Sequence, residues 1–153
     1  MKYLIILITL FFAFSALANV TYPVKNFEYI SDWDYREEVQ DSNKFVVIVF
    51  SSKSCLERIN IERNCFLFEK KLDYFIPGFS SKVKVVGFNT FFDNYTVASQ
   101  FHITKTPTVI LMKNNQIIKR MEASYLSYDI MNGRQGWQDE LLKEVLSTVS
   151  QIR

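Results

Sequence analysis

The sequence has little of the residues that interrupt a folded chain or mark specialised sites. Its 153 residues include only four glycines, three prolines, two cysteines and one histidine. So few glycines and prolines argue against long disordered stretches. The length favours a single domain with a true hydrophobic core, and an apolar content of 48% is ordinary for a globular protein.

An excess of one charge is missing too, as are repeats and glycine-rich phosphate loops. The formal net charge is only +2 and the basic residues are scattered, which argues against nucleic-acid binding. Cys55, Cys65 and His102 are possible ligands for a soft metal, but three scattered ligands without a Cys-x-x-x-Cys motif make a weak pattern. We therefore expect no nucleic-acid partner, no metal and no bound cofactor.

The N-terminus has the pattern of a secretory signal peptide. Lys2 gives a positive start, 4–14 is an apolar run, and 16–18 reads Ala-Leu-Ala, a small-x-small cleavage site. The alternative is an uncleaved anchor, but the run is shorter than the roughly 18–20 apolar residues that span a bilayer. We expect a signal peptide over 1–18, a single domain over 19–153, and no stable membrane insertion after cleavage.

Export would place the two cysteines in an oxidising compartment. The periplasm, the endoplasmic reticulum lumen and the extracellular space all fit, and a disulfide persists in each of them. A disulfide between Cys55 and Cys65 is therefore one of the alternatives to weigh.

Apolar patterning predicts alternating strands and helices. Runs of β-branched and aromatic residues indicate buried strands at 45–50 and 83–88, and two more strands, 108–112 and 116–121, flank the hairpin signal Asn114-Asn115. The predicted helices are a first one capped by Ser31, much of 51–75, a short one near 97–101 capped by Asp93 or Asn94, and 137–152. We interpret 124–136 as a loop. This order predicts an α/β fold, a central mixed sheet flanked by helices on both faces.

Four segments in the same order resemble the thioredoxin-like superfamily, of the thioredoxin or protein disulfide isomerase type. They are SDWDYREEV (31–39), FVVIVFSSKSC (45–55), VKVVGFN (83–89) and VASQFHITKTPTVILMKNNQ (97–116). The resemblance covers about residues 27 to 125. It implies a thioredoxin-like fold in which Cys55 is the nucleophile.

The same resemblance implies a cis peptide bond between Thr106 and Pro107, packed beside Cys55. Such a bond is uncommon and usually marks a tight turn, here immediately before a strand. The backbone of Thr106 would then contact an extended substrate segment. The alternative is an ordinary trans proline opening a strand. Phe91, Phe92 and Tyr95 would lie near this substrate groove.

The cysteine spacing departs from the family pattern, which has two residues between the cysteines. Arg58 occupies the usual resolving position, and Cys65 lies ten residues beyond Cys55, with the nine residues Leu56–Asn64 between them. One regular helix from 55 to 65 would separate the Cα atoms by roughly 15 Å, too far for a disulfide, which needs about 7 Å or less. If the intervening segment loops out, the bond is feasible. A structural disulfide, a redox-active disulfide and unpaired thiols all remain open.

Other departures concern the chemistry around the cysteines. The aromatic residue that precedes the family's nucleophile is Ser54 here, and the family's buried acid falls at Val49. No proton acceptor is therefore identified from the sequence.

These observations predict that the protein is a thiol-disulfide oxidoreductase or isomerase that acts on exported proteins or peptides. Cys55 would be the nucleophile, Cys65 the resolving thiol, and Thr106 with Pro107 the substrate-backbone contact. The alternative is a redox-inert module that binds a protein partner through the same groove.

Overall fold

The computed structural model describes residues 24–52, 55, 65–90, 95–123 and 136–153. The predicted signal peptide, the segment 56–64, the predicted caps Asp93 and Asn94, the aromatic pair Phe91 and Phe92, the side chain of Tyr95, and nearly all of the predicted loop 124–136 lie outside them. No helix among the described residues is long and apolar enough to cross a membrane.

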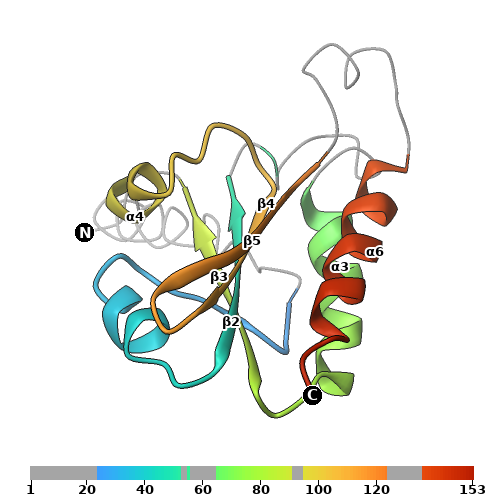
Figure 1. Ribbon diagram of the computed structural model, residues 1–153. Helices are drawn as coiled ribbons and strands as arrows, with labels where there is room; N and C mark the ends of the chain where they lie inside the picture. Colours follow the sequence, from blue (N-terminus) through green and yellow to red (C-terminus); the bar gives the residue numbers. More distant parts are fainter. Residues whose placement is uncertain (1–23, 53–54, 56–64, 91–94, 124–135) are drawn as a thin grey trace, which may run out of the picture.

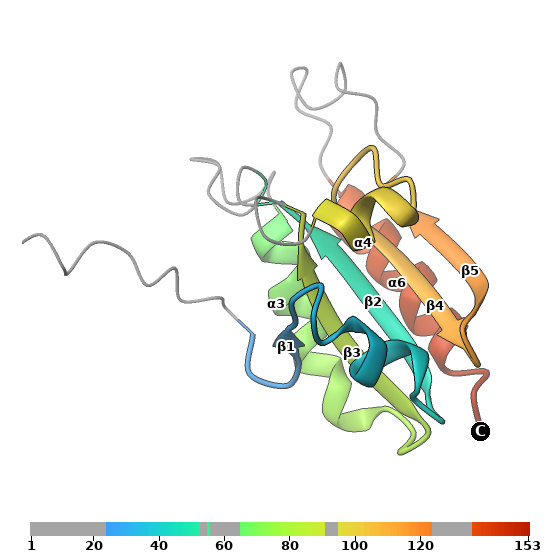
Figure 2. The same cartoon turned by 90° about the vertical axis from the view of Figure 1, so that its left-hand side faces the viewer.

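A five-stranded mixed sheet forms the centre of the molecule, in the order β1-β3-β2-β4-β5 (Figure 2). Its strands are β1 (Glu28–Tyr29), β2 (Phe45–Ser51), β3 (Val83–Asn89), β4 (Thr108–Lys113) and β5 (Gln116–Glu122). β1 and β2 are both parallel to β3, whereas β4 is antiparallel to β2 and to β5. The predicted mixed sheet is confirmed.

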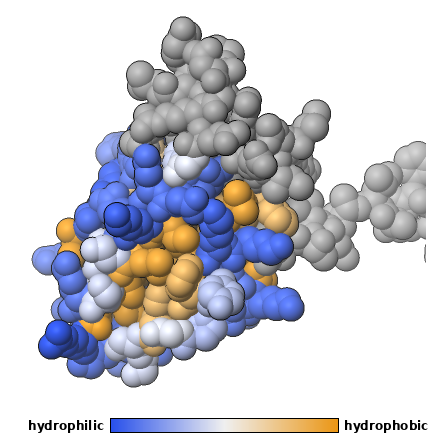
Figure 3. Space-filling view, turned by 90° about the vertical axis from the view of Figure 1, so that its right-hand side faces the viewer, coloured by the Kyte–Doolittle hydropathy of each residue, from blue (hydrophilic) through white to orange (hydrophobic). Residues whose placement is uncertain are grey.

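Helices cover both faces of the sheet. α3 (Cys65–Phe75) and α6 (Trp137–Val149) lie side by side on one face, and α4 (Tyr95–Gln100) and the π-helical turn η1 (Arg36–Gln40) lie on the other (Figures 1 and 2). The 3-10 turn η3 (Ile76–Gly78) ends α3 at the predicted Pro77-Gly78 break. The outer face of the α3 and α6 layer carries apolar side chains framed by polar ones (Figure 3).

Strand β2 is buried on both faces, and its alternate residues belong to two separate cores. Val47 and Val49 pack with α3 and α6, while Val46, Ile48 and Phe50 pack with η1 and α4. Side chains alternate along a strand, so the next residue, Ser51, faces α3. This alternation places a hydroxyl group at the end of the strand, on the side of the sheet where Cys65 lies.

The β4–β5 hairpin forms as predicted around Asn114 and Asn115. Both residues have positive φ angles, 50° and 59°, as a two-residue hairpin turn that follows the twist of the strands requires. The antiparallel register from Thr108↔Glu122 to Lys113↔Gln116 contains one irregularity, between Leu111 and Met112.

The first helix differs from its prediction. Ser31 does not cap a helix: its hydroxyl donates to Asp34 Oδ2 at 2.6 Å, and the π turn that follows begins at Arg36 and has no side-chain cap. Asp32 instead reaches a distant element, because its carboxylate accepts the backbone N–H groups of Thr96 and Val97, at 3.0 and 3.2 Å. The start of α4 is thereby capped by a residue more than sixty positions earlier.

The segment 51–75, which was predicted to be largely helical, differs from its prediction at its start. Ser51 is the last residue of β2, and in the described part of this segment α3 covers Cys65–Phe75. Strand β2 therefore extends one residue beyond its apolar residues, because Ser51 pairs with Asn89 of β3.

Candidate functional site: a disulfide beside a cis proline

Just after the end of β2, hydrogen bonds hold Ser52 and Cys55 in place. The backbone N–H of Cys55 donates to the carbonyl of Ser52 at 2.9 Å and lies 3.2 Å from the Ser52 hydroxyl oxygen. The same hydroxyl is 3.0 Å from Oγ1 of Thr106. Ser52 therefore ties the start of the Cys55 segment to the loop that precedes β4.

Cys55 and Cys65 form a disulfide bond, with their Cα atoms 5.3 Å apart. One unbroken helix joining the two residues is therefore wrong, because it would separate those atoms by roughly 15 Å. The alternative of unpaired thiols is wrong as well, since no described cysteine is free. In the chain-entropy model, closing a ring of this size stabilises the fold by about 3 kcal/mol.

The two sulfur atoms differ in access and surroundings. Cys55 retains 6% of its exposed surface, whereas Cys65, the first residue of α3, retains none. Cys55 Sγ lies 3.7 Å from the backbone carbonyl oxygen of Thr106. An incoming thiolate would therefore meet Cys55 first.

The Thr106–Pro107 peptide bond is cis, and Pro107 is buried. The turn is held from both sides: the Thr108 hydroxyl donates to the Lys105 carbonyl at 2.8 Å, and the Lys105 ammonium pairs with Glu122 of β5 at 2.9 Å. The hydrogen bond from Lys105 is the main reason that the pKa of Glu122 is lowered. The turn brings the backbone of Thr106 against the disulfide.

Glu69 of α3 is a site residue that the sequence analysis missed. It is fully buried, and its Oε1 accepts a hydrogen bond from the Ser51 hydroxyl. Its Oε2 has no hydrogen-bond donor at ordinary distance within the described part of the chain. Burial raises the pKa of Glu69 to about 7, and the hydroxyls of Ser51 and Tyr29 act against that rise.

Glu69 and Cys65 occupy neighbouring positions on one face of α3. They are four residues apart, the spacing that brings side chains together on a helix. The buried residues of α3 are Cys65, Phe68, Glu69, Leu72 and Asp73. The sequence carried this signal, because Glu69 falls on the apolar stripe that Cys65, Phe68 and Leu72 define.

Tyr29 approaches Glu69 because Gly87 has no side chain. Tyr29 of β1 is paired with Gly87 of β3, which is in turn paired with Val49 of β2. A Cβ atom on Gly87 would lie 3.0 Å from two carbon atoms of the Tyr29 ring. The glycine thus lets the ring lie close over β3 within the same core as α3.

The structure brings together Cys55, Cys65, Thr106 and Pro107. His102 makes no contact with this group among the described interactions. His102 is exposed, with a φ angle of 50°, and its carbonyl accepts a hydrogen bond from Arg120 at 3.1 Å. Among the described residues, no group of three or more histidine, cysteine or acidic side chains is arranged to hold a metal ion.

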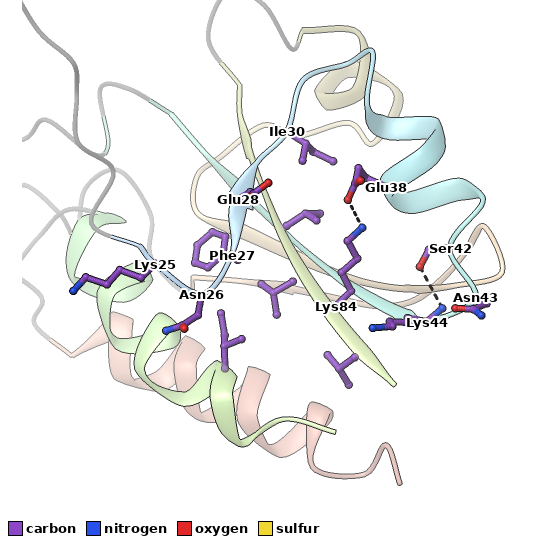
Figure 4. Close-up of a pocket in the computed structure, with 14 residues that line it drawn as sticks. Lys25, Asn26, Phe27, Glu28, Ile30, Glu38, Ser42, Asn43, Lys44 and Lys84 are labelled. Atoms are coloured by element: carbon purple, nitrogen blue, oxygen red, sulfur yellow. Dashed lines mark hydrogen bonds and ion pairs between the residues drawn. The ribbon is translucent and has the colours of Figure 1, made fainter. Parts of the chain in front are cut away.

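A cavity of about 520 Å³ lies at the other end of the sheet, beside the start of β2 and β3 (Figure 4). Lys44 and Val83, which adjoin these strand starts, help to line it, and an ion pair between Glu38 and Lys84 crosses it. The disulfide lies beyond the far end of β2. The cavity therefore takes no part in the cysteine site.

The fold and the disulfide beside a cis proline define a redox-type thioredoxin fold. The family model for thioredoxin matches residues 26–133, and the chain belongs to the thioredoxin family. It is 30% identical over 90 residues to a thioredoxin from Haemophilus influenzae, an alignment that covers 59% of this chain and 77% of that protein.

Proposed function

We propose that this protein exchanges disulfides with exported proteins or peptides through Cys55 and Cys65. The observation that carries the proposal is the position of the disulfide, with the more accessible sulfur, Cys55, 3.7 Å from the Thr106 carbonyl. Thiol–disulfide exchange needs one accessible sulfur and a second one that closes the ring. The unequal burial of the two cysteines supports this division of roles.

The reaction begins from the oxidised state. A substrate thiolate attacks Cys55 Sγ, the bond between Cys55 and Cys65 breaks, and the electron pair remains on Cys65 Sγ. In the reverse direction, the Cys65 thiolate attacks the mixed disulfide at Cys55 and releases the substrate thiolate. Isomerisation of a substrate disulfide combines the two directions.

Thr106 and Pro107 are the proposed contact for the substrate backbone. The cis turn holds Thr106 next to Cys55 and immediately before β4. An extended peptide that pairs with the Thr106 backbone would present its own sulfur to Cys55.

Export is part of the proposal and depends on the N-terminal pattern. Lys2, the apolar run over 4–14 and the Ala-x-Ala site at 16–18 support cleavage after Ala18. Expression in a secreting host and mass spectrometry of the mature chain test it. A chain that begins at Asn19 agrees with the proposal, whereas retention of Met1 or of the whole leader contradicts it.

The burial of both sulfurs favours a second candidate function. In this alternative the protein is a redox-inert binding module and the disulfide is a structural crosslink. The reduction potential separates the two: catalytic pairs lie between about −120 and −270 mV, whereas structural disulfides lie below about −300 mV. A potential in the lower range supports the binding module.

Activity is tested by insulin reduction and by refolding of a scrambled substrate. The matched pair is Cys65→Ser and Cys55→Ser, because each lacks the disulfide and retains one thiol. We expect both variants to lose multiple turnover and only Cys65→Ser, which retains Cys55, to trap mixed disulfides. Background rates in the wild type, equal to those of Cys55→Ser, eliminate the catalytic function.

A further inference from the structure

Two carboxyl groups are buried on α3, and they differ in how many hydrogen bonds their oxygen atoms accept. Asp73 Oδ1 accepts the backbone N–H groups of Lys25 and Asn26, at 2.9 and 2.7 Å, and its Oδ2 accepts the Asn26 side-chain amide at 3.2 Å. These bonds anchor the chain ahead of β1 and account for the burial of Asp73. The burial of Glu69 is not explained by a comparable set of hydrogen bonds among the described residues.

Glu69 has the Ser51 hydroxyl on one oxygen and, within the described residues, no hydrogen-bond donor at ordinary distance on the other. A carboxyl group that is buried with one oxygen lacking a close donor costs free energy in its charged form, and the Tyr29 hydroxyl, which lowers the pKa of Glu69, offsets only part of that cost. Glu69 lies four residues from Cys65 on α3, and both side chains are fully buried. Residues at that spacing on a helix have Cβ atoms about 5–6 Å apart.

Glu69 also lies between the two segments that carry the cysteines. Its own helix begins with Cys65, and its hydrogen-bond donor Ser51 ends the strand from which the chain continues to Cys55. Two other titratable groups lie in these surroundings: Tyr29 from β1, and Asp73 one turn further along α3. Asp139 of α6 pairs with Lys71 at the surface.

We propose that Glu69 holds the proton that Cys65 gains when the disulfide opens and gives up when it closes. The proposal rests on the proposed disulfide exchange. When a thiolate attacks Cys55 Sγ, the Cys55–Cys65 bond breaks, the electron pair goes to Cys65 Sγ, and the Glu69 carboxyl donates its proton to that sulfur. When Cys65 attacks the mixed disulfide, its thiol proton returns to the Glu69 carboxylate.

When the disulfide opens, the proton transfer moves negative charge from the Cys65 sulfur to the Glu69 carboxyl group, which stabilises it better. Sulfur is a weak hydrogen-bond acceptor, and a bare thiolate at the fully buried Cys65 would be costly. The Glu69 carboxylate already has the Ser51 hydroxyl as a donor. With a pKa of about 7, Glu69 has both protonation states populated near neutral pH, as a proton exchanger needs.

The test is the pH dependence of the rate at which dithiothreitol reduces the oxidised protein. Rates are followed by acid quenching and thiol labelling, and are divided by the thiolate fraction of the reagent. For the wild type, the corrected rate should fall about tenfold from pH 6 to pH 8, as a group of pKa about 7 loses its proton. Glu69→Gln, which keeps the size and cannot titrate, should give a flat profile.

Asp73→Asn is the matched control, because it removes the other buried carboxyl of the same helix and should keep the wild-type profile. Identical profiles for the wild type and Glu69→Gln overturn the proposal. The reagent is a small dithiol, so this result does not depend on turnover of a protein substrate. Failure of the proposed function appears separately, in the insulin assay.

A second measurement needs no variant. Carbon-13 NMR titration of the Glu69 carboxyl in the oxidised and the reduced wild type should give pKa values that differ by about one unit, because coupled groups titrate together. Equal values in the two redox states overturn the proposal even if Glu69→Gln fails to fold.

Discussion

The Ser51 hydroxyl donates a hydrogen bond to Oε1 of Glu69 and so joins the last residue of β2 to the buried face of α3. The strand that leads to Cys55 and the helix that starts at Cys65 are thereby connected twice, once by this bond and once by the disulfide. Of these two links, the hydrogen bond involves a titratable group, the Glu69 carboxyl, so a change of pH affects it directly.

The first prediction concerns stability and pH. Glu69 has a pKa of about 7 in the folded protein against an ordinary value of 4.5, so between these values the folded state binds more protons than the unfolded one. The free energy of unfolding of the oxidised protein should therefore fall as pH rises from about 4.5 to about 7, by about 3 kcal/mol from this group, and then level off. Urea titrations across this range measure it.

Glu69→Gln provides the reference for that measurement. The difference between the wild-type and variant curves isolates Glu69, because lowered carboxyl pKa values such as that of Glu122 affect both proteins equally. Parallel curves for the two proteins would show that Glu69 ionises in the folded state as it does in the unfolded one.

The second prediction concerns Ser51→Ala. The hydrogen bond from Ser51 lowers the pKa of Glu69, so its loss should raise that pKa above about 7. The variant should lose about 1–3 kcal/mol of stability above pH 8, where the carboxylate is charged, and less below pH 6. NMR titration and urea unfolding at the two pH values measure both effects. Ser42→Ala, which removes a half-buried hydroxyl that accepts the backbone N–H of Lys44 at 3.2 Å, should leave the pKa of Glu69 unchanged.

Much of this site was accessible from the sequence through periodicity. The alternation along β2 places Val47, Val49 and Ser51 on one face, and helical spacing places Glu69 on the stripe of Cys65. The acid missing at Val49 is thus matched by an acid on the helix that packs against the same face. A search by strand position alone does not find it, because the residue comes from another element.

Other features depend on contacts between distant segments, and local patterns do not determine them. The pairing of Cys55 with Cys65 depends on how nine intervening residues are arranged, and their sequence left both a continuous helix and a looped-out segment open. The cap on α4 comes from Asp32, whose local sequence favoured a helix start at Ser31 instead. In both cases tertiary structure overrides a local preference.

The third prediction concerns this distant cap. Asp32→Ala should destabilise the protein by about 1 kcal/mol, the usual cost of losing a side-chain cap, and should speed hydrogen exchange of the Thr96 and Val97 amides. Asp41→Ala is the control: Asp41 pairs with Arg36 at 3.5 Å where both side chains are well exposed, and its loss should change stability little. Unchanged exchange at Thr96 and Val97 in Asp32→Ala would contradict the capping role.

The last prediction concerns the contact between Gly87 and Tyr29. A methyl group at Gly87 would lie 3.0 Å from the Tyr29 ring and 3.1 Å from Phe27, so Gly87→Ala must displace the tyrosine and should cost about 1–2 kcal/mol. Gly78→Ala is the matched control, because among the described residues none beyond its chain neighbours lies within 4 Å of the added methyl group.

The same displacement should also reach the cysteine site. The Tyr29 hydroxyl lowers the pKa of Glu69, so Gly87→Ala should raise that pKa in the NMR titration. Tyr29→Phe should raise it as well, but with a smaller loss of stability, since it removes the hydroxyl and keeps the ring. If Gly87→Ala destabilises the protein while the pKa of Glu69 stays unchanged, the glycine serves packing alone. If both change, the close approach of Tyr29 over β3 also sets the proton affinity of the buried acid.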